Sequence, residues 1–436
     1  MAGPAIRTLE LAGALARDGR SGPVTVVSLA GVDRAASGVT LTTAEGPRDL
    51  RRLVEAAAAV VIQGDVLGLH PWLVEEDVPL VVDAYDPYHL EQLEQARPLG
   101  PRQRRAVVRD CVRSLNIQLA RADLVLCASA RQRSLWIGHL AALGRVNPLT
   151  YDRAPDLSAL VAVVPFGVPS EPPPARDRSV LSHAFPGISD DDLVLIWGGG
   201  LYEWFDPELL VRAVARVLPE LRHVRLVFLG TRHPVAGVRS AHASAREAAA
   251  DTGILDRAVF FHEGWVPYDE RGCWLRAADV GVSTHRAHVE TEFAFRTRVL
   301  DYLWCGLPVV STGGDDLADH VAERGAGIVV PPGDLESLAA ALRTVVAESE
   351  WRAATAGRSA ALGREFTWDR VARPLAEFCA TPTRSPDLIA DDVDRVQLGL
   401  TGPTGGSLVT RLRGAWREGG PRLLVRRART RLFRAG

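Results

Sequence analysis

The sequence predicts an α/β protein of two domains, each built on a parallel sheet with helices on both faces. Short runs of Val, Ile and Leu without polar alternation are separated by helical patterns, which is typical of buried parallel strands. The 436 residues are many for one hydrophobic core but suit two. Residues 169–178, which include three consecutive prolines, lie between two such alternating units, and we interpret them as a linker.

The first unit opens with a helical pattern at residues 6–16 and closes at residues 162–168. A helix is also predicted at residues 104–119. Its predicted strands are residues 24–29, 60–63, 80–84 and 124–128. No strand pattern precedes the first helix, so either the chain begins after its true first strand or the sheet is one strand short. That strand would be central, and we expect its absence to remove much of the core.

The second unit alternates strands and helices in the same way. Its predicted strands are residues 193–197, 224–229, 259–262, 280–283, 308–311 and 327–330. Ligands bind at the carboxyl ends of the strands in such sheets, so we expect the site in the cleft between the two units. Beyond residue 381 the chain becomes polar and contains Pro and Gly, and we expect low order as far as about residue 405.

Composition and hydropathy predict a cytosolic protein. Hydrophobic residues make up 47% and charged residues 24% of the chain, as in ordinary soluble proteins. The best apolar run, residues 157–168, is broken by Pro165 and is too short for a membrane helix. The sequence shows no basic segment followed by an apolar one at its start, so no export signal is predicted. We interpret the five scattered cysteines as reduced core residues rather than a metal site: Cys111, Cys127, Cys273, Cys305 and Cys379.

Positive charge is concentrated in the tail. Residues 411–436 carry nine Arg and one Glu, so the net charge of −2 for the chain leaves −10 for the first 410 residues. Apolar residues recur among these arginines at roughly helical spacing. The tail is either a basic amphipathic helix that lies on an anionic membrane surface, or a face that is solvated or packs on the protein itself. Nucleic acid is a less suitable partner because the acidic body would repel phosphate.

Residues 290–315 are the most informative stretch of the chain. A polar loop leads into a helix and then into a strand, and the charged residues of this stretch are Glu290, Glu292, Arg296, Arg298 and Asp301, followed by Asp315. The first amides of a helix have no intrahelical partner, and its positive dipole end attracts anions. A carboxylate one turn into the helix can accept hydrogen bonds from the hydroxyls of a ribose. The stretch therefore predicts a site for a nucleotide sugar.

Two further features fit a phosphate site. The chain contains no lysine, so every cationic contact must come from arginine, whose guanidinium can hold phosphate with two parallel hydrogen bonds. Gly199 and Gly200 follow a predicted strand and allow the backbone to approach a phosphate closely. Tyr202 or Trp204 could then stack on a base. A purely structural turn is the alternative for these glycines.

This stretch resembles the donor site of family 4 retaining glycosyltransferases of GT-B fold, whose pattern is Glu-x7-Glu, a short helix and Gly-x-Pro-Val-Val. Asp301 stands five residues before Gly306, where that family has its ribose-binding Glu. Eight positions earlier the chain has Phe293, so the first carboxylate is displaced to Glu290 or Glu292. Arg298 matches a position where many relatives carry a diphosphate-binding Lys.

The resemblance extends to about Phe378 and implies a domain plan. Residues 1–170 would form an N-terminal Rossmann-like acceptor-side domain, and residues 171–365 a C-terminal Rossmann-like domain that binds the nucleotide sugar. Residues 366–380 would be a helix crossing back to the first domain. Residues 381–436 would be a flexible segment and the basic tail. The parallel sheets of the two domains would face a shared cleft.

The resemblance also implies an activity. It implies transfer of a sugar, with retention, from a nucleotide-diphosphate sugar to a hydroxyl of a glycan or lipid-linked acceptor, in cell-surface polysaccharide synthesis. The expected location is the cytoplasm, or the inner face of the plasma membrane if the basic tail binds an anionic surface. Helix amides and Arg298 would neutralise the leaving diphosphate, and Glu290 or Glu292 would hold the sugar. No metal or other cofactor is expected. The residues expected to bind the donor are Gly3, Gly199, Gly200, Arg286, Arg296, Thr297 and Asp301.

Polar residues at the strand ends of the first unit are candidates for the acceptor side. Asp83 lies near the end of one predicted strand, Asp86 and His89 follow that strand, and Gln63 ends the strand before it. Asp86 could orient an acceptor hydroxyl, whereas the alternative is turn formation by an Asp that precedes Pro.

Three other readings remain open at this stage. The spacing of His285 and His288 suggests metal ligation, but no third ligand is evident, and a polar loop lining the cleft is favoured. A sugar-nucleotide epimerase could share this fold and phosphate site. An inactive nucleotide-sugar-binding subunit would fit the lacking first strand, the displaced Glu and the absence of the Arg and Lys that relatives carry near the glycine-rich turn.

Overall fold

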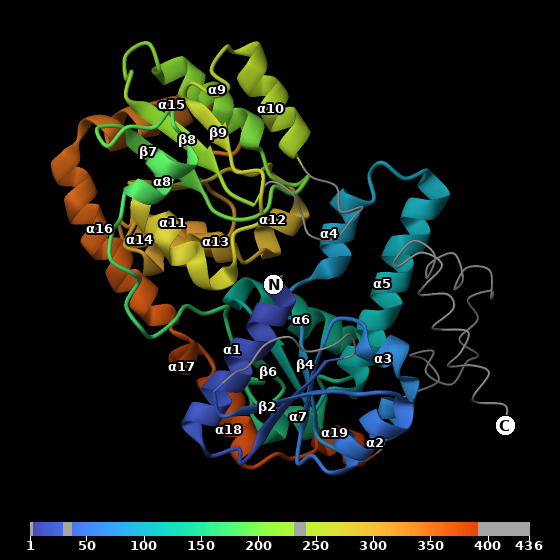
Figure 1. Ribbon diagram of the computed structural model, residues 1–436. Coiled ribbons are helices and arrows are strands. Elements are labelled where there is room, and N and C mark those ends of the chain that lie inside the picture. Colours follow the sequence, from blue (N-terminus) through green and yellow to red (C-terminus); the bar gives the residue numbers. More distant parts are fainter. Residues whose placement is uncertain (1–2, 29–36, 231–240, 391–436) are drawn as a thin grey trace.

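The computed structural model describes residues 3–28, 37–230 and 241–390 of the chain. These residues form two α/β lobes, with Gly3, the first described residue, at their junction (Figure 1). The described strands are arranged in three sheets, all with parallel pairing. The predicted α/β class is confirmed. The tail at residues 411–436 and residues 391–405 of the expected low-order segment lie outside the described residues.

The C-terminal lobe contains one six-stranded sheet in the order β12-β11-β10-β7-β8-β9. Its strands are β7 (Leu193–Trp197), β8 (Val224–Phe228), β9 (Val259–Phe261), β10 (Val280–Ser283), β11 (Val309–Thr312) and β12 (Gly327–Val330). The sequence predicted all six to within one residue at each end. Most of their side chains are buried, because helices cover both faces of the sheet, and this explains their unbroken apolar runs.

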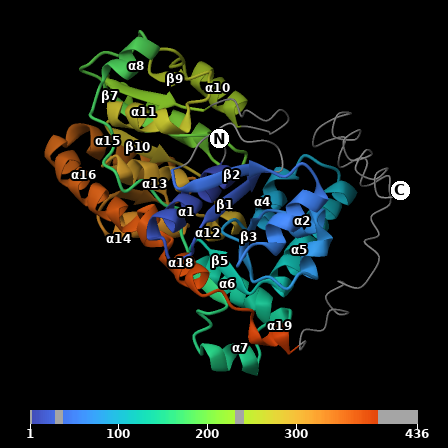
Figure 2. The ribbon, with the colours of Figure 1, turned by 60° about the horizontal axis from the view of Figure 1, so that its bottom comes forward.

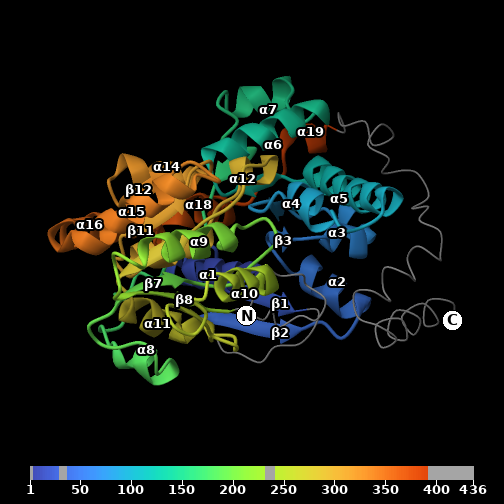
Figure 3. The same ribbon diagram turned by 90° about the horizontal axis from the view of Figure 1, so that it is seen from above.

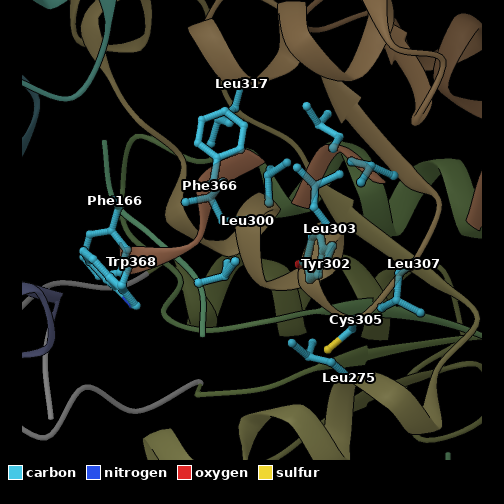
Figure 4. Packing of buried hydrophobic residues seen from close by; sticks show 14 of the residues in the cluster. Phe166, Leu275, Leu300, Tyr302, Leu303, Cys305, Leu307, Leu317, Phe366 and Trp368 are labelled. Atoms are coloured by element: carbon cyan, nitrogen blue, oxygen red, sulfur yellow. The ribbon is translucent and has the colours of Figure 1, made fainter. Parts of the chain in front are cut away.

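The helices of this lobe connect the strands in turn. They are α8 (Ser179–Ala184), α9 (Pro207–Val217), α10 (His242–Asp251), α11 (Arg271–Ala277), α12 (Val289–Phe293), α13 (Thr297–Trp304), α14 (Asp316–Glu323), α15 (Leu335–Ala347) and α16 (Ser349–Gly363). Helix α13 buries one face, which includes Leu300 and Leu303, in the core shown in Figure 4. This packing fixes the orientation of the helix, so that its first turn faces the other lobe.

The N-terminal lobe contains a four-stranded sheet in the order β3-β4-β5-β6 and a separate pair, β1-β2. The strands are β1 (Val24–Ser28), β2 (Val39–Thr43), β3 (Val60–Gln63), β4 (Leu80–Asp83), β5 (Leu124–Cys127) and β6 (Val161–Val163). The helices are α1 (Gly3–Asp18), α2 (Pro47–Glu55), α3 (Val66–Leu69), α4 (Tyr88–Gln95), α5 (Pro101–Arg121), α6 (Ala130–Ala142) and α7 (Pro148–Arg153).

The sheet of the N-terminal lobe is interrupted between β1 and β3. We expected a sheet without its central strand, and in the described residues β1 is hydrogen-bonded only to β2, and β3 only to β4. The consequence is visible in burial: β4 and β5 are buried throughout, whereas Val61 of β3 leaves 42% of its surface exposed. The interruption lies between β1 and β3 (Figure 2), and the apolar surface that it leaves uncovered is on β3.

The chain returns to the N-terminal lobe after α16. Helices α17 (Trp368–Val371) and α18 (Arg373–Ala380) pack on α1, and the amide of Trp368 donates to the carbonyl of Val168 over 2.9 Å. A Cβ at Gly167 would lie 2.6 Å from the Trp368 indole, so only glycine permits this approach. Phe166 and Trp368, whose ring centroids are 4.8 Å apart, join the cores of the two lobes at this crossing.

The expectation of low order directly after Thr381 was wrong for residues 383–390. Helix α19 (Pro386–Ile389) lies beside α7 (Figure 2), and Asp387 forms a fully buried ion pair with Arg145 at 2.6 Å. Arg145 also donates to the carbonyls of Leu119, Ala120 and Ala122. The segment is ordered although it is polar, because its polar groups are bonded to the N-terminal lobe.

Two other sequence expectations concern cysteines and membrane helices. The five cysteines are free, but only Cys127 and Cys305 are buried and Cys273 is exposed, so the interpretation of all five as core residues was wrong. Among the residues that the structure describes, no helix is both long and apolar enough to cross a membrane.

The buried Arg145–Asp387 pair yields the first prediction. Asp387→Ala leaves the Arg145 charge buried and unpaired, and we expect the free energy of unfolding to fall by about 3 kcal/mol or more. The matched control is Asp369→Ala, which removes the half-exposed partner of Arg17 and should cost about 1 kcal/mol or less. Urea denaturation of the two variants compares them, and equal losses would contradict the assigned role of α19.

Candidate functional site

A cavity of about 520 Å³ lies between the two lobes. Its walls come from the first residues of α1, the loop after β4, the glycine-rich turn after β7 and the start of α13. Helix α12, which leads into α13, contacts α4 and α6 of the other lobe (Figure 3). The sequence-predicted residues that line the cavity are Gly3, Asp86, Gly199, Gly200, Glu290, Arg296, Thr297, Arg298 and Asp301.

The N-terminus of α13 is open toward this cavity. Arg296 precedes the helix, and no side chain caps its first turn. Thr297 and Arg298 both line the cavity, so the first amides of the helix and the positive end of its dipole are directed at the same space. An anion placed there would be stabilised by the backbone before any side chain contributes.

Arg298 is held beneath this helix end by aromatic rings. Its guanidinium carbon lies 4.2 Å from the ring centroid of Trp197 and 4.1 Å from that of Phe205, and its Nη2 donates to the Gly200 carbonyl over 2.7 Å. Its Nη1 is buried without a hydrogen-bond partner. Burial lowers the pKa of Arg298 to about 10, so the group stays cationic at neutral pH.

Arg298 differs from the other cations of the cavity. Arg271 is paired with Asp301 at 2.9 Å, and Arg296 is paired with Glu290. Within the described parts of the chain, Arg298 is the arginine of the cavity wall that has no carboxylate partner. It is therefore the cation of the wall whose charge no carboxylate compensates.

The glycine-rich turn needs its glycines. Gly199 has a φ of +87°, and a Cβ at Gly230 would lie 3.2 Å from the Gly199 backbone. The Gly198 amide donates to the Tyr302 hydroxyl over 2.8 Å, and that hydroxyl donates to the Val282 carbonyl over 2.9 Å. Tyr302 thus fixes the turn relative to α13. Two segments distant in sequence are held together as one wall of the cavity.

Glu290 and Glu292 have different environments. Glu290 is buried, lines the cavity and accepts two hydrogen bonds from Arg296, of 3.0 and 2.8 Å. Glu292 is exposed and lies outside the cavity wall, so its assignment as a sugar-holding residue was wrong. Arg296 was predicted to bind the donor, but Glu290 already neutralises its guanidinium, so it has less charge to offer to an anion.

Carboxyl groups gather on the side of the cavity that the N-terminal lobe supplies. Asp86 follows β4, and Glu91 lies one turn further on, in α4. Burial raises the pKa of Asp86 to about 7, and the nearby charge of Glu290 contributes to this rise. Burial and then the charge of Asp86 raise the pKa of Glu91 well above its ordinary value. Glu91 was not among the predicted site residues, because nothing in its helical context marks it as facing a cleft.

Other predicted residues lie away from the cavity. Asp83 is buried and accepts hydrogen bonds of 2.7 and 2.9 Å from Arg7 and one of 3.1 Å from Gln63. The side chains of Asp83 and Gln63 are therefore bonded within the N-terminal lobe. His89 packs against the Trp136 ring at 5.8 Å, and burial lowers its pKa to about 4. These acceptor-side assignments were wrong, because Asp83 and Gln63 are bonded inside the lobe and His89 packs on Trp136, so none of the three lines the cavity.

Arg286, His285 and His288 also lie outside the cavity wall. Arg286 is exposed, with Glu208 3.9 Å away, so its donor-binding assignment was wrong. His285 is buried, and burial followed by the Arg296 charge lowers its pKa to about 3. His288 accepts a hydrogen bond from the Thr291 amide and caps α12. The favoured reading of the histidine loop as lining the cleft was therefore wrong, and in the described residues no three metal-ligating side chains come together.

Comparison with known proteins agrees with this architecture. A family model described as glycosyl transferases group 1 matches residues 192–348, which contain β7 to α15 and the start of α13. These residues, less than half of the chain, carry the likeness to the group 1 glycosyltransferases. Curated relatives are D-inositol 3-phosphate glycosyltransferases, of which that of Geodermatophilus obscurus is 31% identical over 60% of this chain and 53% of its own length. That of Stackebrandtia nassauensis is 31% identical over 52% of each chain. The chain thus spans about half the length of these relatives.

Solved structures extend the likeness from the group 1 glycosyltransferase domain to both lobes. Sucrose-phosphate synthase from Thermosynechococcus elongatus has a TM-score of 0.65, with 16% identity over 86% of this chain and 92% of its own. HepE from Anabaena in complex with UDP-glucose has a TM-score of 0.60, with 17% identity over 87% and 96%. The predicted GT-B fold, with two domains whose parallel sheets face a cleft, is confirmed.

The Asp86 carboxyl makes stability depend on pH. Its pKa rises from an ordinary 3.8 to about 7 on folding, so the unfolded chain loses this proton first and stability falls as pH rises between these values. Asp86→Asn removes that loss. We expect the variant to be more stable than the natural chain at pH 8, by roughly 1 to 3 kcal/mol, and the gain to be smaller at pH 5.

Thermal unfolding at the two pH values measures this difference. Asp110→Asn, which neutralises an exposed carboxyl of α5, is the control and should show no such pH-dependent gain. A gain for Asp86→Asn that is the same at pH 5 and pH 8 would show that the carboxyl is not held protonated.

Proposed function

We propose that this protein is a retaining glycosyltransferase that moves a sugar from a nucleotide-diphosphate donor to a hydroxyl of a glycan or lipid-linked acceptor in cell-surface polysaccharide synthesis. The observation that carries the proposal is Arg298, which faces the cavity without a carboxylate partner beside the open N-terminus of α13. A guanidinium and helix amides directed at one point suit a diphosphate.

The positive groups act where charge develops. As the bond between the anomeric carbon and the diphosphate breaks, negative charge grows on the leaving oxygen, and Arg298 and the amides of Thr297 and Arg298 stabilise it. These groups are fixed before reaction by the Trp197 and Phe205 rings and by the packing of α13. We expect no metal ion or other cofactor to be needed for this step.

Retention follows from attack on the face that the diphosphate leaves. The acceptor oxygen bonds to the anomeric carbon on that face, and its proton passes to an oxygen of the departing diphosphate. Glu290 is an unsuitable nucleophile, because both of its oxygens accept hydrogen bonds from Arg296. We assign it instead to holding hydroxyls of the transferred sugar, together with the positioned Arg296.

The remaining donor contacts fit the same orientation. Asp301 lies one turn into α13 with 27% of its side chain exposed, and its pairing with Arg271 leaves acceptor sites for ribose hydroxyls. Gly199 and Gly200 permit close approach of the diphosphate to the turn after β7. The solved HepE structure of this fold, which contains UDP-glucose, supports a nucleotide sugar as the ligand class.

Removing the Arg298 charge tests this assignment. We expect Arg298→Gln to lower kcat by about 100-fold or more, which corresponds to about 3 kcal/mol of lost stabilisation of the leaving group. Arg286→Gln removes a neighbouring exposed cation outside the cavity and is the matched control, with unchanged turnover. Release of nucleoside diphosphate is measured with UDP and GDP sugars, and circular dichroism verifies that each variant folds. Unchanged turnover in a folded Arg298→Gln variant would refute the assignment.

The same assay separates the competing functions. Conversion of the donor sugar to its epimer without an acceptor would indicate a sugar-nucleotide epimerase. Donor binding, seen as a raised melting temperature, without turnover on any acceptor would indicate an inactive binding subunit, a reading that the interrupted sheet between β1 and β3 supports.

We further propose that the protein associates with the cytoplasmic face of an anionic membrane through residues 411–436 and through a groove between α4 and α5. The groove has a volume of about 1100 Å³ and is lined by five arginines over an apolar floor that includes Leu93, Leu99 and Val108. The arginines are Arg97, Arg102, Arg104, Arg105 and Arg109. Each cation near an anionic surface contributes about 1 kcal/mol.

Vesicle sedimentation tests the groove. We expect Arg102→Glu/Arg105→Glu to reduce binding to vesicles with anionic lipid by about tenfold or more, and the natural chain to lose binding as salt rises. The control Arg222→Glu/Arg257→Glu reverses two exposed charges on the other lobe and should bind as the natural chain does. Equal binding of all three proteins would contradict a role for the groove.

A further inference from the structure

The two walls of the cavity differ in charge. The cationic side chains that line it, Arg271, Arg296 and Arg298, all belong to the C-terminal lobe. In the described residues, the wall of the N-terminal lobe contributes two carboxyl groups, Asp86 and Glu91, and no Arg, Lys or His. The donor side of the cleft therefore attracts anions, and the opposite side does not.

The acidic side is short of positive charge. Asp86, Glu91 and Glu290 lie close enough to affect one another, and the cation among them is Arg296, which both oxygens of Glu290 already engage. The raised pKa of Asp86 and Glu91 reports the same shortage, because burial and neighbouring carboxylates disfavour a further negative charge. An anionic ligand group placed there would meet the same repulsion.

A metal ion would be one way to relieve this shortage. In the described parts of the chain, however, no three His, Cys, Asp or Glu side chains are arranged to hold one. Carboxyl groups that are not coordinated to a cation are strong hydrogen-bond acceptors, and a protonated carboxyl is also a donor. Gln95, which lines the same wall, adds an amide that can donate and accept.

We propose that Asp86, Glu91 and Gln95 form the acceptor subsite, and that the acceptor group which enters it is an uncharged, hydroxyl-rich ring, a sugar or cyclitol without phosphate. This inference rests on the proposed transferase function and adds the charge class of the acceptor. Hydroxyl groups match the carboxyl and amide oxygens of the wall. Any phosphate of a larger acceptor must lie outside this subsite.

Matched acceptor pairs test the proposal. Natural protein is incubated with UDP-glucose, UDP-N-acetylglucosamine or GDP-mannose and with myo-inositol or its 3-phosphate, glucose or its 6-phosphate, and N-acetylglucosamine or its 6-phosphate. Nucleotide release and product mass give kcat/KM for each. For the pairs that react, we expect the unphosphorylated member to be favoured by at least tenfold. Equal rates, or a preference for the phosphorylated members, would overturn the proposal.

A variant without the two carboxyl groups tests whether they cause the preference for unphosphorylated acceptors. At pH 8, where Asp86 with a pKa of about 7 is mostly ionised, Asp86→Asn/Glu91→Gln should reduce the preference for the unphosphorylated member by at least tenfold, because it removes that negative charge while keeping the shape of the wall. Asp110→Asn/Glu55→Gln neutralises two exposed carboxyls outside the cavity and should keep the preference unchanged. If the first variant keeps the full preference for unphosphorylated acceptors, other residues cause that preference and the proposed subsite is refuted.

Failure of the function and failure of the inference give different results. No turnover with any acceptor, although a donor raises the melting temperature, would refute the transferase function and the acceptor subsite together. Turnover that favours the phosphorylated members would leave the transferase intact and refute only the uncharged acceptor.

Discussion

Arg298 is a partly buried cation whose surroundings hold it in place without neutralising it. Trp197 and Phe205 flank the guanidinium, and a carbonyl of the glycine-rich turn accepts one of its hydrogen bonds. Such a group is costly unless something supplies negative charge, and the neighbouring helix end has the same requirement. The cleft, the turn after β7 and the packing of α13 together hold this uncompensated charge at the wall of one small cavity.

The pairing of the other charges sharpens this picture. Arg271 and Arg296 line the cavity as Arg298 does, but Asp301 and Glu290 compensate their charges. On the facing wall the carboxyls of Asp86 and Glu91 lack such compensation. Gln132 holds the two walls together by donating to the Tyr85 carbonyl of one lobe and the Phe293 carbonyl of the other, both over 2.8 Å. The result is a cleft with an anion-attracting half and an anion-repelling half.

Sequence patterns predicted the parts of this arrangement that depend on local order. The strands of the C-terminal lobe were recognisable because burial on both faces leaves continuous apolar runs, and Arg298 and Asp301 because helix position fixes where they point. Glu290 and Arg298 were also suggested by a family resemblance. The interruption of the N-terminal sheet followed from the lack of a strand pattern before α1.

The errors concern partners that are distant in sequence. Asp83 was predicted to be an acceptor residue because no pattern in the sequence shows that it is paired with Arg7, 76 positions earlier. Polar residues 383–390 resembled a disordered linker because Asp387 finds Arg145 from 242 positions away. Glu91 was missed because its role depends on the opposite lobe closing over α4. Spacing along the chain carries information on faces and ends of elements, but not on which charges neutralise each other.

The position of a bound diphosphate tests the account most directly. A crystal structure of the protein with UDP should place diphosphate oxygens within hydrogen-bond distance of the Arg298 guanidinium and of the first amides of α13. If the diphosphate is bound elsewhere in the cleft, with Arg298 still facing only its aromatic neighbours and the Gly200 carbonyl, the account is contradicted.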